Sequence, residues 1–233
     1  MKISDLKIQL NQYEIACSDE QINLLDKFMN RTLETNEKFN LTAIKDKDQF
    51  VEKMIFDSAL VLANADLANK KVIDIGTGAG YPGMVLKILE PDADMFLLDS
   101  TAKKINYLNE FSLEKDIPIH GVTARAEEYV KEHREEFDVA TARAVASLNI
   151  LLEIIIPLLK VGGEFIAMKG AGYEKEINDS LNAFKKLNCY IEFVEEFTLP
   201  ESQESRAIIH IVKEKPTPKK YPRMYNEIKR LPL

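Results

Sequence analysis

The chain contains the segment Val72-Ile73-Asp74-Ile75-Gly76-Thr77-Gly78-Ala79-Gly80-Tyr81-Pro82-Gly83, in which a short apolar run ends at closely spaced glycines. This pattern is typical of a strand that turns into a helix, because glycine lets the backbone approach a ligand closely. Dinucleotides and S-adenosylmethionine are both bound at such turns. Residues 78–83 even satisfy the dinucleotide pattern, so the glycines alone leave the two cofactor classes open.

Three details of the segment favour S-adenosylmethionine over a dinucleotide. Asp74 lies near the end of the strand, where its carboxylate would repel a pyrophosphate but attract the amino group of a methionine moiety. The dinucleotide match begins three residues after the strand ends and is therefore out of register. Pro82 lacks the backbone N–H that a phosphate-binding helix would offer.

Asp99 ends the next apolar run, 23 residues after Gly76. A carboxylate at this position can accept hydrogen bonds from both hydroxyls of a ribose. Both cofactor classes carry a ribose, so Asp99 predicts a nucleoside site without distinguishing them.

The composition of the 233 residues is that of an ordinary globular protein, with 45% hydrophobic and 30% charged residues. No apolar run approaches the roughly 20 residues that cross a bilayer, and residues 1–10 contain no signal-peptide core, so we expect a cytoplasmic protein. Cys17 and Cys189 lie far apart, without metal-ligand spacing.

The net charge of −7 conceals an asymmetry between the tail and the rest of the chain. Residues 213–233 carry seven Lys or Arg and two Glu, whereas residues 1–212 carry 24 basic and 36 acidic residues. A basic tail on an acidic body can bind a polyanion locally, although a solvated, frayed terminus explains the charges equally well.

Periodicity predicts an α/β fold with three parts. Residues 1–65 show helical spacing and form an N-terminal extension, residues 66–213 form the cofactor-binding domain, and residues 214–233 form the basic tail. The expected strands are 72–75, 95–98, 117–122, 137–141, 164–168, 190–197 and 206–212, with helices over 102–115, 148–159 and 177–184 between them. Alternating strands and helices predict a mostly parallel sheet with helices on both faces, and the last two strands predict an antiparallel strand at one edge.

Several further motifs occur in a fixed order along the chain. They are Asn40-Leu41-Thr42-Ala43, Asp57-Ser58, the glycine segment, Arg125-Ala126-Glu127, Thr141-Ala142-Arg143-Ala144-Val145-Ala146, Met168-Lys169-Gly170 and Lys220-Tyr221-Pro222-Arg223. This series closely resembles the glucose-inhibited division protein B family, the bacterial 16S rRNA guanine-7 methyltransferases. One departure is Met54, which stands where the family usually has a histidine, and a methionine there removes a hydrogen-bond donor.

The resemblance implies a seven-stranded, Rossmann-like class I methyltransferase fold with an N-terminal helical extension. It implies S-adenosylmethionine as cofactor and the small ribosomal subunit or its 16S rRNA as partner. The methyl acceptor would be ring nitrogen seven of a guanosine in the 530 loop. That nitrogen carries a free lone pair and no proton, so the reaction requires no general acid or base. We expect no catalytic or metal-binding role for His120, His133 or His210, which show no ligand spacing.

The predicted site residues follow from the resemblance together with the residue types. The cofactor-binding residues are Asp74, Gly76, Gly78, Gly80, Tyr81, Asp99, Ala126, Glu127 and Arg143. The substrate-side candidates are Arg143, Lys169 and Arg206, and the RNA-binding candidates are Arg125, Lys220, Tyr221 and Arg223. Guanidinium groups pair with carboxylate or phosphate alike, so Arg143 could hold either the cofactor or the RNA. Tyr81 and Tyr221 are candidates for base stacking or, equally, for packing.

Three alternatives remain at this point. A methyltransferase of the same fold could act on another RNA or on a protein, and a non-catalytic RNA-binding protein could retain the fold. An NAD-dependent oxidoreductase is disfavoured by Asp74 and by the register of the glycines. We expect a monomer, because no long exposed apolar stripe is left unassigned. The sequence leaves open whether naked RNA, an assembling particle or the finished subunit is the substrate.

Overall fold

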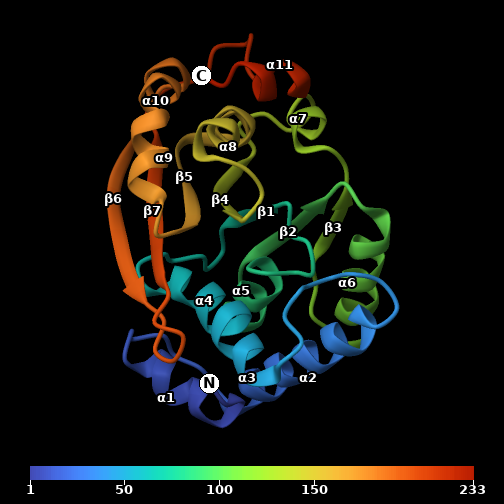
Figure 1. Ribbon diagram of the computed structural model, residues 1–233. Helices are drawn as coiled ribbons and strands as arrows, with labels where there is room; N and C mark the ends of the chain where they lie inside the picture. Colours follow the sequence, from blue (N-terminus) through green and yellow to red (C-terminus); the bar gives the residue numbers. More distant parts are fainter.

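A computed structural model of residues 1–233 contains one seven-stranded sheet (Figure 1). Its strands are β1 (Lys71–Ile75), β2 (Asp94–Asp99), β3 (His120–Thr123), β4 (Phe137–Arg143), β5 (Leu159–Gly170), β6 (Cys189–Thr198) and β7 (Ser205–Lys213). The strand order is β3-β2-β1-β4-β5-β7-β6, and strands β1 to β5 pair in parallel. This arrangement confirms the predicted seven-stranded, mostly parallel α/β fold.

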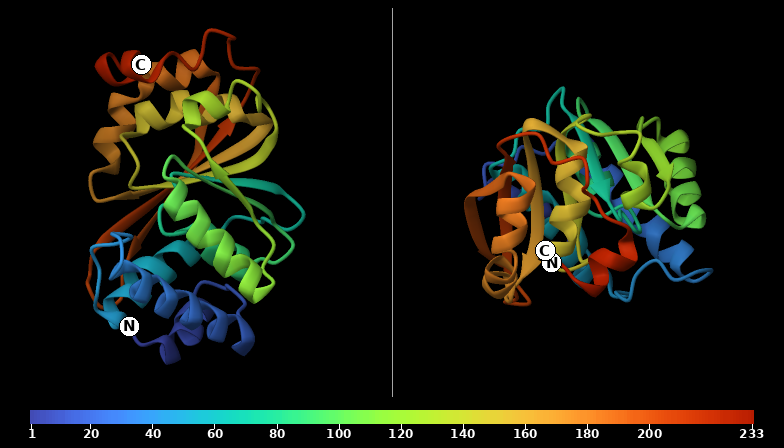
Figure 2. Two further views of the ribbon diagram at one scale, coloured as in Figure 1. Left: turned by 90° about the vertical axis from the view of Figure 1, so that its right-hand side faces the viewer. Right: turned by 90° about the horizontal axis from the view of Figure 1, so that it is seen from above.

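Helices cover both faces of the sheet (Figures 1 and 2). They are α1 (Ile3–Asn11), α2 (Asp19–Asn36), α3 (Lys47–Phe50), α4 (Asp57–Ala59), α5 (Gly83–Leu89), α6 (Ala102–Lys115), α7 (Ala126–Tyr129), α8 (Leu148–Ile155), α9 (Tyr173–Asp179), α10 (Leu181–Leu187) and α11 (Tyr225–Arg230). Alternate residues of β1 enter different cores, with Val72 on the side of α1 to α6 and Ile73 on the side of α8 to α11. None of these helices is both long and apolar enough to cross a membrane.

The N-terminal helices share the first of these two cores. Ser18 caps α2 and forms a reciprocal capping box with Gln21, which fixes where the helix begins. Leu25 and Phe28 of α2 are fully buried in the same cluster as Met84 of α5. The extension is therefore packed against the sheet's own helices.

An irregular helical stretch follows α3. Residues Val51–Phe56 form a π-helix, η1, which continues into α4 and then into a 3-10 turn, η2 (Leu60–Ala63). A π-helix inserts an extra residue into the turn and is often found beside functional sites. Here it directs Lys53 and Met54 toward the end of β4, as described below.

Three expectations about the elements need correction. The strand expected over 117–122 begins only at His120, because Pro118 has no N–H to contribute to a ladder. The helix expected around Ile177 to Phe184 is two helices, α9 and α10, separated at Ser180. The antiparallel strand is β7, which lies one position inside the edge, between β5 and β6. The helix expected over 102–115 is confirmed as α6.

The basic tail is packed against the body. Arg134 donates hydrogen bonds to the carbonyl groups of Tyr221 and Thr217, at 2.6 and 3.1 Å. Ile228 of α11 is fully buried in the second core, beside α8. The tail is therefore not frayed, although most of its charged side chains remain exposed to solvent.

Candidate functional site

Two adjoining cavities open at the carboxyl ends of the parallel strands. The larger has a volume of about 730 Å³ and the smaller about 300 Å³. Gly76 of the glycine loop, Lys104 of α6, and Ala144 and Ala146 of the β4–α8 loop line both of them. Ligands of open α/β sheets bind in this location, outside the carboxyl ends of the strands.

The glycine loop separates β1 from α5 and forms the floor between the cavities. Gly76, Gly78 and Gly80 all have positive φ angles, of 70°, 60° and 95°, a conformation that side chains rarely tolerate. A Cβ atom built on Gly78 would meet only the carbonyl oxygen of Gly76, at 3.8 Å. The loop therefore leaves room for a ligand to lie directly on its backbone.

Asp74 lies beneath this loop and is fully buried. Its carboxylate accepts hydrogen bonds from the backbone N–H of Gly83 at 3.0 Å and from the Thr141 hydroxyl at 2.9 Å. Burial raises the pKa of Asp74, and these two donors oppose that shift. Asp74 does not line either cavity and ties the loop to β4 and α5, so its predicted contact with a cofactor stays a prediction.

The smaller cavity gathers the residues predicted to hold a nucleoside. Asp99, at the end of β2, accepts hydrogen bonds from the N–H groups of Thr101 at 2.8 Å and Gly78 at 3.1 Å. Ala126 and Glu127 line the same cavity. Apolar side chains, including those of Leu98, Ala124, Leu151 and Ile154, supply much of its remaining wall. A polar carboxylate edge beside an apolar slot fits a ribose joined to a flat base.

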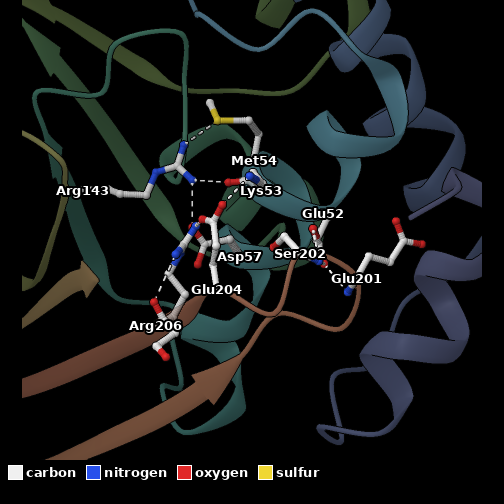
Figure 3. Close-up of polar contacts among 10 residues, drawn as sticks. Glu52, Lys53, Met54, Asp57, Arg143, Glu201, Ser202, Glu204 and Arg206 are labelled. Atoms are coloured by element: carbon white, nitrogen blue, oxygen red, sulfur yellow. Dashed lines mark hydrogen bonds and ion pairs between the residues drawn. The ribbon is translucent and has the colours of Figure 1, made fainter. Parts of the chain in front are cut away.

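The larger cavity carries most of the positive charge, and Figure 3 shows the polar contacts of three of its cations, Lys53, Arg143 and Arg206. Arg143, at the end of β4, donates one hydrogen bond to the Lys53 carbonyl at 2.9 Å and another to Asp57 at 3.3 Å. Its second terminal nitrogen lies 3.2 Å from the sulfur of Met54. Met54, the departure from the family pattern, therefore contacts a predicted site residue directly.

Arg206 and Lys169 complete the set of substrate-side candidates around this cavity. The Nε of Arg206, on β7, lies 3.4 Å from the Asp57 carboxylate, which thus faces two arginines. Burial raises the pKa of Asp57, while both arginines act in the opposite direction. Lys169, at the end of β5, pairs with Glu176 at 2.7 Å. All three predicted residues meet at one cavity although they come from three different strands.

Sequence reasoning assigned no role to Lys53, Asp57 or Lys104, which also line the larger cavity. Asp57 belongs to the Asp57-Ser58 motif of the family resemblance, so the sequence did contain a signal for it. Lys53 reaches the site through the π-helix η1, whose extra residue has no signature in the sequence.

The aromatic candidates are packing residues in this structure. The Tyr81 ring is 3% exposed and stacks on Phe28 with a centroid distance of 5.0 Å. Burial raises the pKa of Tyr81 well above its ordinary value. Only part of Tyr81 reaches the larger cavity. Tyr221 is 4% exposed within the second core.

The predicted RNA-binding residues do not form one group. Arg125 lines the smaller cavity, whereas Lys220, Tyr221 and Arg223 line neither cavity. Arg223 forms a two-pronged pair with the fully buried Glu153 of α8, at 2.8 and 2.6 Å. Lys220 is exposed, with its amine 5.2 Å from the centre of the Tyr221 ring.

Comparison with known proteins gives consistent matches at the level of sequence. A sequence model of the family described as rRNA small subunit methyltransferase G matches residues 21–208. The ribosomal RNA small subunit methyltransferase G of Caldanaerobacter subterraneus subsp. tengcongensis is 46% identical over 214 residues, which cover 89% of this chain and 88% of that protein. The protein of the same name from Halalkalibacterium halodurans is 38% identical over the full length of both chains.

Solved structures share the fold at low sequence identity. TYW2 of M. jannaschii, solved in complex with AdoMet, superimposes with a TM-score of 0.53 at 14% identity, covering 64% of this chain and 71% of that one. A putative methyltransferase from Bacillus halodurans C-125 gives a TM-score of 0.55 at 14% identity, covering 68% of this chain and 99% of that one.

Proposed function

This chain belongs to the rRNA small subunit methyltransferase G family, and on that premise we propose that it transfers a methyl group from S-adenosylmethionine to 16S rRNA. The acceptor in this proposal is ring nitrogen seven of a guanosine in the 530 loop. The observation that carries it is the pair of adjoining cavities, which share the wall at Gly76. One has the chemistry of a nucleoside site, and the other is open and cationic.

The residues around the smaller cavity fit the adenosine part of the cofactor. Asp99 offers carboxylate oxygens to a ribose, and Ala126 and Glu127 border the apolar slot for the base. The open backbone at Gly78 allows close approach along the loop. The methionine part would then extend toward Arg143 in the larger cavity, where a guanidinium can pair with its carboxylate.

Methyl transfer to this nitrogen requires the side chains mainly to align the two reactants. Bound S-adenosylmethionine supplies an electrophilic methyl group on its sulfonium. The acceptor nitrogen has an in-plane lone pair and no proton to lose, so no residue has to act as a base. The protein contributes by holding the purine and the methyl donor in line and by excluding alternative geometries.

The cations of the larger cavity suit the RNA side of the reaction. Lys169 and Arg206 are partly buried, and each has a carboxylate partner that keeps it oriented. Phosphate contacts of this kind position an RNA without reading its sequence. Arg125 can add a contact at the smaller cavity, and Lys220 remains a candidate on the tail. Tyr221 and Arg223 support the tail from within, so we propose a structural role for both.

The wider organisation follows the same proposal. We assign residues 1–65 to an extension, 66–213 to the catalytic domain and 214–233 to a basic tail. We further propose a monomer that acts in the cytoplasm, where ribosomal subunits are assembled.

The test is transfer of radiolabelled methyl from S-adenosylmethionine to small ribosomal subunits lacking the modification, followed by nucleoside analysis. Label in 7-methylguanosine is the expected result. Label in another nucleoside, or in ribosomal protein, would favour a methyltransferase of the same fold that acts on a different substrate. Cofactor and RNA binding without any transfer to naked 16S rRNA, assembly particles or subunits would favour a non-catalytic RNA-binding protein.

The role of Arg143 can be tested in the same assay. If Arg143→Ala loses transfer but keeps its affinity for the cofactor, Arg143 acts on the substrate side. A parallel loss of cofactor affinity, measured by calorimetry, would assign it to the methionine carboxylate instead.

A further inference from the structure

The carboxylate of Glu204 lies at the rim of the larger cavity and bridges two cations (Figure 3). One oxygen pairs with the amine of Lys53, and the other lies 2.7 Å from a terminal nitrogen of Arg206. These interactions hold the pKa of Glu204 below its usual value, with the hydrogen bond from Lys53 as the largest cause. Two oxygens of one anion thus bind two cations, which is also the way a phosphate group would bind them.

The backbone that carries Glu204 is fixed, although its side chain is exposed. Glu52 is 2% exposed, and its carboxylate accepts hydrogen bonds from the N–H groups of Glu201 at 2.6 Å and Ser202 at 3.0 Å. These contacts anchor the β6–β7 loop to the π-helix that carries Lys53. The Glu204 side chain is 43% exposed and can therefore rotate into solvent without moving the loop.

Arg206 has a second partner that is not exchangeable in this way. Asp57 is 5% exposed and lies between Arg206 and Arg143, at 3.4 and 3.3 Å. If Glu204 moved away, Asp57 would still orient Arg206. Lys53 would then face the cavity without any carboxylate partner, because Glu204 is its only one, while Arg206 would keep Asp57 alone.

We propose that Lys53 and Arg206 form a binding site for an RNA phosphate, and that Glu204 occupies this site until the RNA displaces it. The proposal rests on the proposed function, because it takes the RNA substrate as the source of the phosphate. In the free protein, Glu204 neutralises the site and lowers its affinity for unrelated polyanions. A bound RNA must therefore offer enough other contacts to offset the loss of the Glu204 pairs. The carboxylate thereby trades affinity for selectivity.

The decisive variant is Glu204→Gln, which keeps the shape of the side chain and removes its charge. Its matched control is Glu136→Gln, which also breaks a partly exposed pair, with Lys71, together with a contact to His133, but at the opposite end of β4, before the strand begins. The assay is equilibrium binding of each protein to small ribosomal subunits that lack the modification, at low and moderate salt.

We expect Glu204→Gln to bind the subunits about two- to fivefold more tightly than the wild type, the range given by one exposed ion pair. The gain should shrink as salt is raised, because salt screens exposed charges. It should also disappear in the double variant Lys53→Gln/Glu204→Gln. Glu136→Gln should bind as the wild type does.

Equal affinities of Glu204→Gln and Glu136→Gln would overturn the phosphate site, and so would weaker binding by Glu204→Gln. Both results leave the proposed function intact if the wild type still transfers methyl groups. A wild type that neither binds nor methylates RNA or subunits would instead overturn the proposed function, and the phosphate site with it.

Discussion

Replacement of Asp57 by Asn removes the one carboxylate that faces both Arg143 and Arg206. The side chain is 5% exposed and follows directly on the π-helix, so an Asn of the same shape should be accommodated without a cavity. Both arginines contact the same carboxylate oxygen, and an amide oxygen in its place would carry no net charge. The two guanidinium groups would then share a partly buried space without a compensating negative charge between them.

The structure limits how much stability this change should cost. Removing one partner of a buried ion pair typically costs about 3–5 kcal/mol. Here the contacts to Asp57 are long, at 3.3 and 3.4 Å, and both arginines keep other partners: Arg143 the Lys53 carbonyl and Arg206 the Glu204 carboxylate. The raised pKa of Asp57 also shows that its charge is costly to bury. We therefore expect a loss of about 2 kcal/mol at pH 7, below the usual range.

This loss corresponds to a decrease in Tm of about 4–8 °C for a chain of this size. We expect a larger effect on activity, with kcat/KM for methyl transfer lower by about 10- to 100-fold, because both arginines lose their fixed orientation. Calorimetry measures the Tm, and a labelled-methyl assay at 25 °C measures the transfer. Asp179→Asn, which breaks the exposed pair with Lys175, is the matched control and should change neither by much. A variant with wild-type Tm and undiminished transfer would refute the reasoning.

Three further predictions concern the loop and the tail. Asp74→Asn should keep the hydrogen bond from the Gly83 N–H and turn its NH2 group toward the Thr141 hydroxyl, which would then accept, so we expect the variant to be about as stable as the wild type at pH 7. Because the folded pKa of Asp74 is raised, only the wild type should gain stability as the pH falls through that pKa, and urea unfolding from neutral to acidic pH in which the variant gained instead would contradict the prediction. Gly83→Ala should lower the free energy of unfolding by about 1–3 kcal/mol, because the added Cβ would lie 2.2 Å from Cδ2 of Leu97. An unchanged midpoint in chemical denaturation would disprove this close packing. Arg223→Ala should lower the free energy of unfolding by about 2–3 kcal/mol, because Glu153 would stay buried without its guanidinium partner, and should leave the affinity for RNA at low salt unchanged. Unchanged thermal stability together with weaker RNA binding would instead support Arg223 as an RNA contact.

The elements that were predictable from the sequence are those with a local cause. The turn at Gly76 and Gly78 requires positive φ angles, so the end of β1 could be recognised directly. The apolar spacing of α6 gave its bounds correctly. Asp99, at the end of β2, was found for the same reason, because its place depends only on where that strand stops.

The features that the sequence did not reveal depend on contacts between distant segments. Whether Arg223 meets RNA or Glu153 depends on how the tail packs on α8, and nothing near Arg223 encodes that. Lys53 reaches the cavity because a π-helix adds a residue to its turn, a choice made by tertiary packing. The position of β7 between β5 and β6 likewise depends on its pairing with β5, which is remote in sequence.

The most direct test of the central claim is to locate the transferred methyl group. Small subunits lacking the modification would be treated with the protein and S-adenosylmethionine, and their 16S rRNA would then be reduced and cleaved with aniline, which breaks the chain at 7-methylguanosine. We predict a new cleavage at one guanosine of the 530 loop that requires both the protein and the cofactor. Methyl incorporation with no cleavage in that loop would contradict the assigned substrate, and the absence of incorporation into any form of 16S rRNA would contradict the assigned activity.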